Sequence, residues 1–326
     1  MNKFLLVLVL TLVACDSDLD TIMFQKFQKF MKKYNKKYES IREFLGRYIV
    51  FKRNVMKTLK KKNLSYKTGI TKFFDLTRQE FAKTYLNLNY GAKNVVNLKP
   101  YKVKAKNDAP DSWDWRDQGV VCPVKDQASC GSCWAFSAIG NLEGLFAIGT
   151  GHLLCLSEQL LVDCDYYDSG CNGGLMEYAF TFLQENGGIN TEDDYPYDGY
   201  QGDCRADPSK YIDMLVTGFK AFCDFTECDE NDMKDWLYET APLSVALNAD
   251  PLMWYDGGII DDDSCDPSAL DHGVTLVGYG TEDGVDYWLL KNSWGSGWGE
   301  SGYFRMVRGK GMCGINTYVV TATVSF

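Results

Sequence analysis

Hydrophobic residues in the first quarter of the chain recur at helical spacing. The first helical face comprises Phe24, Phe27, Met31 and Tyr34, and the second comprises Phe44, Tyr48, Phe51, Val55 and Leu59. Lysines fill the opposite sides of both segments. Apolar residues three or four positions apart are typical of amphipathic helices, so the pattern predicts a helical N-terminal region.

The first 15 residues, MNKFLLVLVLTLVAC, hold one lysine and then a short apolar run. Such a run is too short to cross a bilayer and is typical of a secretory signal peptide. Leu12 to Cys15 also fit a lipoprotein cleavage box with Cys15 lipidated, but we expect ordinary cleavage near Ala14 to Ser17. No later stretch is apolar enough to span a membrane, so no stable membrane insertion is expected.

Two further helices are predicted at residues 132–145 and 175–185. After Gly273 the pattern changes to short β-rich runs, GVTLVGYG, DYWLLKNSW and GYFRMVRG, and an Asp283-Gly284 turn separates the first two. Helices followed by antiparallel strands predict an α+β architecture.

Charge divides the chain into two unlike halves. Residues 17–108 hold 23 lysines and arginines against 7 acidic residues, whereas residues 109–326 hold 10 against 36. A basic segment alone would favour nucleic acid or a membrane surface. Beside an acidic segment of the same chain it favours binding between the halves, so no nucleic-acid partner is expected. The polar, lysine-rich residues 91–110 are predicted to be a linker.

Cysteine is abundant and histidine is scarce. Eleven of the 12 cysteines follow Cys15, and the two histidines are His152 and His272. A secreted chain this rich in cysteine is expected to be largely disulfide-bonded. Because eleven is odd, at least one thiol stays unpaired, which indicates a functional role.

The segment CGSCW, Cys130 to Trp134, allows three interpretations. A redox dithiol of the thioredoxin type would place its tryptophan before the first cysteine, within a βαβ unit that this sequence lacks. A zinc site would need further ligand pairs, and the only other close pair, Cys223 and Cys228, has no histidine nearby in the sequence. The third interpretation, a nucleophile with a structural neighbour, fits best.

Cys133 lies at the predicted start of a helix, where unpaired N–H groups and the helix dipole stabilise a thiolate. A thiolate nucleophile needs a base, and the base needs an orienting group. His272 is the candidate base and Asn292 the candidate orienting residue. Gln127 could donate a side-chain N–H to an oxyanion, together with the backbone N–H of Cys133.

The chain resembles the papain-family cysteine proteases, closest to the cathepsin L and cathepsin F group. CGSCW matches the family pattern C-G-[SA]-C-[WY], and His272 lies 139 positions after Cys133. The family's remaining motifs follow in order: DWRDQGVV, VKDQASCGSCWAFSAIGNLEG, LSEQLLVDCD, GCNGGLMEYAF, DHGVTLVGYG and KNSWGSGWGESGYFRM.

The resemblance implies an α+β, papain-like two-lobe fold, in which a helical lobe and an antiparallel β-barrel-like lobe flank the active cleft. It also implies a signal peptide (1–15), an inhibitory helical propeptide (16–108) and a peptidase domain (109–326). Cys133 would open the central helix of the helical lobe, His272 and Asn292 would face it, and Trp294 would cover their hydrogen bond. His152 has no role in the family and is expected to be an ordinary surface histidine.

Three disulfides follow from the resemblance: Cys130–Cys171, Cys164–Cys204 and Cys265–Cys313. Cys122, Cys155, Cys223 and Cys228 lie outside that framework, and we prefer the pairs Cys122–Cys155 and Cys223–Cys228. Cys133 is then the free thiol.

The resemblance also implies the substrate-binding residues. Gly173 and Gly174 would offer backbone hydrogen bonds to an extended peptide, with Asp271 and Trp294 also beside the substrate. The S2 pocket would consist of Leu175, Met176, Ala246, Leu270 and Tyr318, which predicts apolar P2 residues and poor acceptance of arginine.

The pro-region keeps the family spacing of Glu43, Arg47, Phe51 and Asn54. Departures from the pattern are Thr58, Lys62, Thr71 in place of asparagine, and Ala128 in place of the glycine after Gln127. Asn63 begins a glycosylation sequon.

We therefore expect an active cysteine endopeptidase, made as a secretory-pathway zymogen that works in a lysosome, a similar acidic compartment or outside the cell. Its partners would be protein and peptide substrates, its own propeptide and cystatin-type inhibitors, and a monomer without cofactor or metal is expected. A catalytically dead relative is disfavoured because all four active-site residues are present. An exopeptidase of the cathepsin B kind is disfavoured because no third histidine exists.

Overall fold

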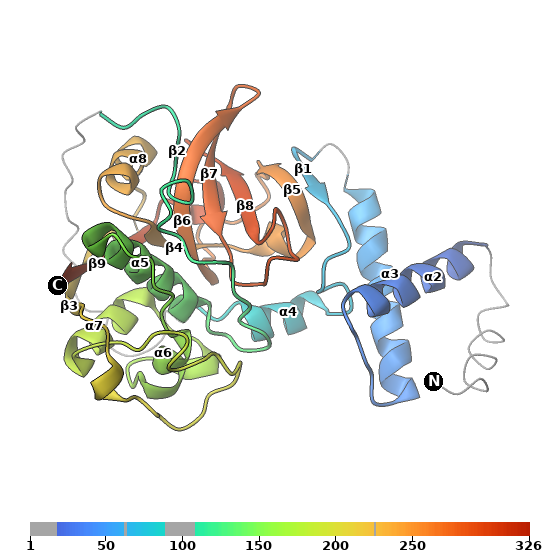
Figure 1. Ribbon diagram of the computed structural model, residues 1–326. Helices are drawn as coiled ribbons and strands as arrows, with labels where there is room; N and C mark the ends of the chain where they lie inside the picture. The colour runs from blue at the N-terminus through green and yellow to red at the C-terminus, as the bar shows by residue number, and fades with distance from the viewer. Residues whose placement is uncertain (1–17, 62–63, 89–107, 225) are drawn as a thin grey trace.

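The computed structural model describes residues 18–61, 64–88, 108–224 and 226–326. The predicted signal peptide with Cys15, the residues Lys62 and Asn63, and most of the predicted linker lie outside these ranges. Figure 1 shows an N-terminal helical part, a β-rich part and a second helical part. Within the described ranges, we find no helix with the length and apolarity that crossing a bilayer requires.

The N-terminal part is helical, as the sequence predicts. Its elements are α2 (Asp18–Lys33), α3 (Ile41–Lys60), β1 (Tyr66–Thr68) and α4 (Arg78–Tyr85). The ring of Phe51 on α3 packs against those of Phe27 and Phe30 on α2, with centroid separations of 5.2 Å and 5.0 Å. Leu59 was expected on the buried face but is 59% exposed, because the last turn of α3 extends beyond the core that buries Phe51 and Val55.

The second helical part contains α5 (Cys133–Thr150), α6 (Glu158–Cys164), η1 (Gly170–Asn172), α7 (Met176–Asn186) and η2 (Pro208–Lys210). Helix α5 extends five residues beyond its predicted end at Leu145 and stops at Gly151, whose φ of 75° lies in the left-handed region. Glycine adopts this conformation readily, which makes it a common helix terminator.

The β-rich part contains β2 (Trp113–Asp114), β3 (Leu215–Asp224), β4 (Leu243–Leu247), β5 (Tyr255–Ile260), β6 (His272–Glu282), β7 (Val285–Lys291), β8 (Tyr303–Val307) and β9 (Tyr318–Ser325). Its short helices are α8 (Glu230–Glu239), η3 (Asp250–Trp254) and η4 (Met312–Gly314).

One sheet joins these strands in the order β1-β5-β8-β7-β6-β4-β9-β3, with β2 paired to β6. The predicted Asp283-Gly284 turn connects β6 to β7, and both residues have positive φ angles, 52° and 79°, as a tight two-residue hairpin turn requires. The α+β prediction is confirmed. The lobe is not wholly antiparallel, however, because β5 and β8 pair in parallel at Ile259–Arg305 and Ile260–Met306.

Two hydrophobic cores underlie the fold. One lies in the second helical part, and the other joins the β-rich part to the N-terminal part. Helix α5 packs along the sheet, with its first residue, Cys133, close to the start of β6. Strand β1 pairs antiparallel with β5 through Tyr66 and Gly258, so the N-terminal part extends the sheet by one strand.

Candidate active site

Cys133 is the first residue of α5 and is fully buried. The backbone N–H groups of Gly273, Asn87 and Trp134 lower the pKa of its thiol. Glycine at position 273 permits this packing, because a Cβ atom there would lie 3.3 Å from the carbonyl oxygen of Cys133. The start of β6 therefore packs directly on the start of α5, next to His272.

His272 and Asn292 are joined by a hydrogen bond. The distance from His272 Nε2 to Asn292 Oδ1 is 2.8 Å, and both side chains are buried. His272 is the first residue of β6, whereas Asn292 directly follows β7, the neighbouring strand. The indole of Trp294 stacks on the imidazole at a centroid distance of 4.8 Å and shields the hydrogen bond from water.

Gln127 lies beside this pair with its carboxamide fixed at both ends. Its Oε1 atom accepts hydrogen bonds from Ser293 Oγ at 2.6 Å and Trp294 Nε1 at 3.1 Å. These two bonds assign the amide nitrogen, Nε2, to the opposite side. There it donates to the carbonyl oxygens of Cys130 and Tyr85, at 2.9 Å and 3.3 Å.

Tyr85, the last residue of α4, and the following residues 86–88 occupy the cleft. The backbone N–H of Gly174 donates to the carbonyl of Asn87 at 3.3 Å, and the N–H of Leu88 donates to the carbonyl of Asp271 at 3.2 Å. A Cβ atom at Gly173 would lie 2.2 Å from the carbonyl oxygen of Asn87, so only glycine leaves room for this backbone. Leu88 and Gly174 form a parallel β-bridge.

The side chain of Leu88 is buried with the residues assigned to the S2 pocket. They belong to one buried cluster and are Leu175, Met176, Ala246, Leu270 and Tyr318. Leu88 itself is only 7% exposed. The structure thus joins His272, Asn292, Trp294 and Gln127 by direct contacts and packs Cys133 against Gly273, whereas His272 Nδ1 has no hydrogen-bond partner among the described residues.

Two families match the chain. The cathepsin propeptide inhibitor domain matches residues 27–81, and the family described as papain family cysteine protease matches residues 109–323. The chain belongs to the papain family of cysteine proteases.

Curated relatives and solved structures agree with this membership. The chain is 43% identical to mouse cathepsin F over 317 residues, which cover 94% of this chain and 66% of that protein. It is 40% identical to cysteine proteinase 15A of pea, over 92% of this chain and 86% of the relative. A digestive procathepsin L 3 from the larval midgut of Tenebrio molitor superimposes with a TM-score of 0.83 at 38% identity, covering 92% of this chain and 99% of that one.

Aromatic packing and hydrogen bonds attach the propeptide to the papain-like domain. Phe73 and Phe81 contact the indole of Trp294, with ring centroids 5.0 Å and 5.4 Å away. Thr71, which stands in place of the family's asparagine, donates a hydrogen bond to the carbonyl of Met253 at 2.7 Å. The propeptide therefore covers Trp294 and, beneath it, the His272–Asn292 bond.

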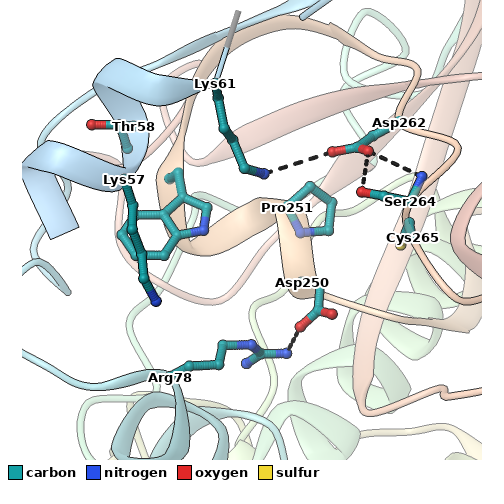
Figure 2. A pocket seen from close by; sticks show the side chains of 10 residues that line it. Lys57, Thr58, Lys61, Arg78, Asp250, Pro251, Asp262, Ser264 and Cys265 are labelled. Atoms are coloured by element: carbon teal, nitrogen blue, oxygen red, sulfur yellow. Dashed lines mark hydrogen bonds and ion pairs between the residues drawn. The ribbon is translucent and has the colours of Figure 1, made fainter. Parts of the chain in front are cut away.

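Ion pairs cross the same interface, in line with the opposite charges of the two halves. Figure 2 shows Arg78 paired with Asp250 and Lys61 with Asp262, around a cavity of about 280 Å³. Arg78 also lies 3.4 Å from Asp271, the residue before His272. The predicted association of the basic and acidic halves is thus formed by specific contacts, apolar as well as ionic.

Burial changes the protonation of the two reactive groups. It raises the pKa of the Cys133 thiol to about 11, and the N–H groups around the sulfur only partly oppose this effect. Burial also lowers the pKa of His272 to about 4, against the opposing hydrogen bond with Asn292. We expected a thiolate at the start of α5, but in the propeptide-bound form burial outweighs the helix terminus and both groups are neutral near pH 7.

Five disulfides link ten cysteines, and Cys133 is the only free cysteine among the described residues. The bonds are Cys122–Cys155, Cys130–Cys171, Cys164–Cys204, Cys223–Cys228 and Cys265–Cys313. In CGSCW, therefore, the first cysteine is structural and the second carries the thiol.

The propeptide motif residues fix the segment that leads to the cleft. Asn54 on α3 donates to the carbonyl oxygens of Phe74 and Leu76, at 2.9 Å and 2.8 Å. Arg47, on the same helix, donates to Glu80 at 2.9 Å. These contacts orient α4 toward the active site.

Sequence reasoning missed α4 and residues 85–88 as the occupants of the cleft. A usable signal was present, because Thr77 and Glu80 form a capping box, which marks the start of a helix. The apolar residues Phe81 and Tyr85 then follow at helical spacing. Residues 86–88 carry no comparable pattern, since backbone groups make most of their contacts.

Proposed function

We propose that the chain is an endopeptidase zymogen whose mature form cleaves peptide bonds with Cys133 as nucleophile. His272 is the general acid and base, Asn292 holds the imidazole, and Gln127 with the Cys133 N–H binds the oxyanion. The buried His272–Asn292 hydrogen bond beneath Trp294 carries this proposal, because it fixes the imidazole at the residue before Gly273, which packs on Cys133, the only free cysteine among the described residues.

The reaction follows from these positions. The Cys133 thiolate attacks the carbonyl carbon, and the developing oxyanion receives hydrogen bonds from Gln127 Nε2 and the Cys133 N–H. The C–N bond breaks as the His272 imidazolium gives its proton to the leaving amine. Neutral His272 then takes a proton from water, whose oxygen attacks the acyl carbon. The C–S bond breaks, the acyl group is released as a carboxylic acid, and Cys133 returns to a thiolate beside the imidazolium.

The propeptide blocks this chemistry through both its direction and its burial of the site. The carbonyl of Tyr85 accepts a hydrogen bond from Gln127, the N–H of Asn87 acts on the thiol, and Leu88 is buried in the cluster that holds the residues assigned to the apolar pocket. The segment therefore runs N to C from the oxyanion donors to the pocket. A substrate runs the opposite way, because its P2 residue precedes the carbonyl that is attacked.

Specificity and cellular route are part of the same proposal. Leu88 in the apolar pocket supports a preference for leucine, valine or phenylalanine at P2. We assign residues 1–15 to a signal peptide, 16–108 to the propeptide and 109–326 to the peptidase, which acts as a monomer in a lysosome-like acidic compartment or outside the cell. Cystatin-type inhibitors are further proposed partners.

The decisive experiment labels the acid-activated protein with an epoxide thiol-protease inhibitor and locates the modified residue. Cys133 should carry the label, and Cys133→Ala should remove both the label and peptide hydrolysis. Gln127→Ala should lower kcat/KM by about 10²–10³, as expected for the loss of one oxyanion donor. Hydrolysis by the Cys133→Ala protein would show that the nucleophile lies elsewhere.

A positional peptide library tests the pocket assignment. Leucine, valine and phenylalanine should lead at P2, whereas arginine should be poor because none of the assigned pocket residues carries a carboxylate. Arginine ranking first at P2 would refute the assignment of this pocket.

A further inference from the structure

Asp165 and Asp168 lie behind the Gly174–Leu175 segment, which the proposed function assigns to peptide binding. Asp168 accepts a hydrogen bond from the backbone N–H of Leu175 at 3.0 Å. Its carboxyl group also packs on the neighbouring backbone, because a Cβ atom at Gly174 would lie 2.5 Å from Asp168 Cγ and 2.7 Å from the Trp134 indole. Asp168 therefore packs against the Gly174–Leu175 segment, and Trp134 of α5 packs against the same glycine.

Asp165 faces Asp168 from the end of α6. It is 4% exposed, and its Oδ1 atom accepts backbone hydrogen bonds from Tyr167 at 2.8 Å and Asp168 at 3.3 Å. The Oδ2 atoms of both aspartates are shielded from solvent, and no N–H or O–H group of the described residues donates to either. The backbone N–H of Asp168 thus ties this residue to the Asp165 carboxyl group, and each of the two side chains acts on the pKa of the other.

Two carboxyl groups in this arrangement need a proton between them. Two ionised carboxylates in contact repel each other, whereas one protonated group donates a hydrogen bond to the other. Burial raises the pKa of Asp165 and also that of Asp168, on which the negative charge of Asp165 acts as a further cause. The pair consequently loses its shared proton at a higher pH than the one at which an ordinary carboxyl group ionises.

The groups around the pair strengthen this effect. Glu177, in the first turn of α7, is 4% exposed and acts on Asp168 with its negative charge. Tyr167 and Tyr178 are the other titratable groups that sense the pair. Glu185, by contrast, is exposed on α7, where it accepts hydrogen bonds from the hydroxyl groups of Tyr166 and Tyr167. Among the described residues, no lysine or arginine forms an ion pair with Asp165 or Asp168.

We propose that Asp165 and Asp168 share one proton and act as positioning residues that hold Gly174 and Leu175 in place for peptide binding. Loss of that proton places two like charges behind the segment, breaks the support of Gly174 and weakens substrate binding. The inference rests on the proposed peptidase function and adds a pH limit that is separate from the Cys133–His272 chemistry. It predicts an effect on KM as the pH rises toward and above neutrality.

The test uses the full chain, activated in acid, and a peptide with leucine at P2. For the wild-type enzyme, KM should rise about tenfold between pH 5 and pH 7.5, with little effect of this pair on kcat. Asp165→Asn keeps the shape and replaces the shared proton with a permanent amide N–H donor. Its KM should therefore change less than about twofold over the same range, and Asp168→Asn should behave alike.

Glu177→Gln gives a result of opposite sign, which a structural role alone does not produce. Removing the negative charge of Glu177 makes ionisation of the pair easier, so KM should begin to rise at a lower pH than in the wild type. The matched control is Glu185→Gln, which removes an exposed charge from the same helix outside the pair and should leave the KM profile close to that of the wild type.

Active-site titration with the epoxide inhibitor counts the folded, competent enzyme in each preparation. It therefore distinguishes failure of the shared-proton proposal from failure of the proposed peptidase function. A wild-type enzyme that is active but shows a KM independent of pH overturns the shared-proton proposal and leaves the peptidase assignment intact. An Asn variant whose KM still rises as in the wild type also overturns it. Absence of hydrolysis in titratable wild-type protein contradicts the peptidase function itself.

Discussion

The ammonium nitrogen of Lys291 lies 3.7 Å from a carboxylate oxygen of Glu143. Lys291 directly precedes Asn292 and Glu143 lies on α5, so this ion pair joins β7 to α5. Both side chains are almost completely buried, with exposures of 10% and 1%. Lys125 lies on the other side of Glu143, at 3.5 Å, and 2.7 Å from Glu158. The two lobes are thus connected by buried charges close to the proposed catalytic residues.

Lys291→Met should be strongly destabilising, because it leaves a buried carboxylate with one partner fewer. The free energy of unfolding should fall by roughly 3 kcal/mol, measured by urea denaturation in a Cys133→Ala background that prevents self-cleavage. The matched control is Lys310→Met, which breaks an exposed pair with Asp261 and should have little effect. Equal losses from both substitutions would contradict the role of burial.

Leu88→Ala should weaken the hold of the propeptide on the cleft. Truncating a buried leucine costs about 2–3 kcal/mol, so acid-triggered processing of the full-length zymogen should begin at a higher pH than in the wild type. Gel analysis over a pH series measures this onset. Leu59→Ala changes a leucine of the same propeptide that is 59% exposed, and it should process like the wild type. An unshifted onset in Leu88→Ala would mean that other contacts hold the segment.

The stability of the zymogen should fall as the medium is acidified, partly through His272. Its pKa is about 4 in the folded, propeptide-bound state, below the ordinary value of 6.5. The unfolded state therefore binds the proton more readily. The contribution of His272 to the free energy of unfolding is present in full above about pH 6.5 and is lost as the pH falls toward 4. The loss should be on the order of 3 kcal/mol from this group.

Denaturation of the Cys133→Ala zymogen at pH 7 and pH 4 measures that loss. The double variant with His272→Gln should lose less stability over the same interval, because glutamine does not titrate. His152→Gln, at the exposed second histidine, should leave the interval unchanged. An identical loss in the His272→Gln protein would place the acid sensitivity in the carboxylates of the interface.

Ala128→Gly should stabilise the chain. Ala128 has a φ of 52°, in the left-handed region that alanine adopts only at a cost, and it directly follows Gln127. Glycine there should raise the free energy of unfolding by about 1 kcal/mol, measured in urea. The same substitution at Ala147, inside α5, should lower it by a similar amount. A loss of stability in Ala128→Gly would show that the alanine methyl group packs usefully against Gly199.

The sequence predicted the fold class and the family because local patterns carry both. Phe27 and Phe51 recur at helical spacing, Asp283-Gly284 favours a tight hairpin turn, and CGSCW with His272 is a family motif. The catalytic assignments of Cys133, His272, Asn292 and Gln127 stay proposals, although their arrangement supports them.

Other features depend on contacts between distant segments, which no local pattern records. The parallel pairing of β5 with β8, the exposure of Leu59 and the backbone contacts of residues 86–88 are set by tertiary packing. The sequence predicted a thiolate at Cys133, whereas burial in the propeptide-bound form raises the pKa of the thiol. A helix terminus can be identified from the sequence, but the burial that opposes its effect cannot.

Strand β1, which belongs to the propeptide, also affects the edge of the sheet. While it is paired with β5, it covers the outer edge of the sheet. Removal of the propeptide leaves the N–H and C=O groups of β5 on that side facing water, and free edges invite pairing with other chains. Strand β5 is poorly suited to such pairing, because Gly257 and Gly258 have φ angles of 150° and 89° and interrupt its regular pleat. Maturation thus converts a covered edge into an open one that resists self-association.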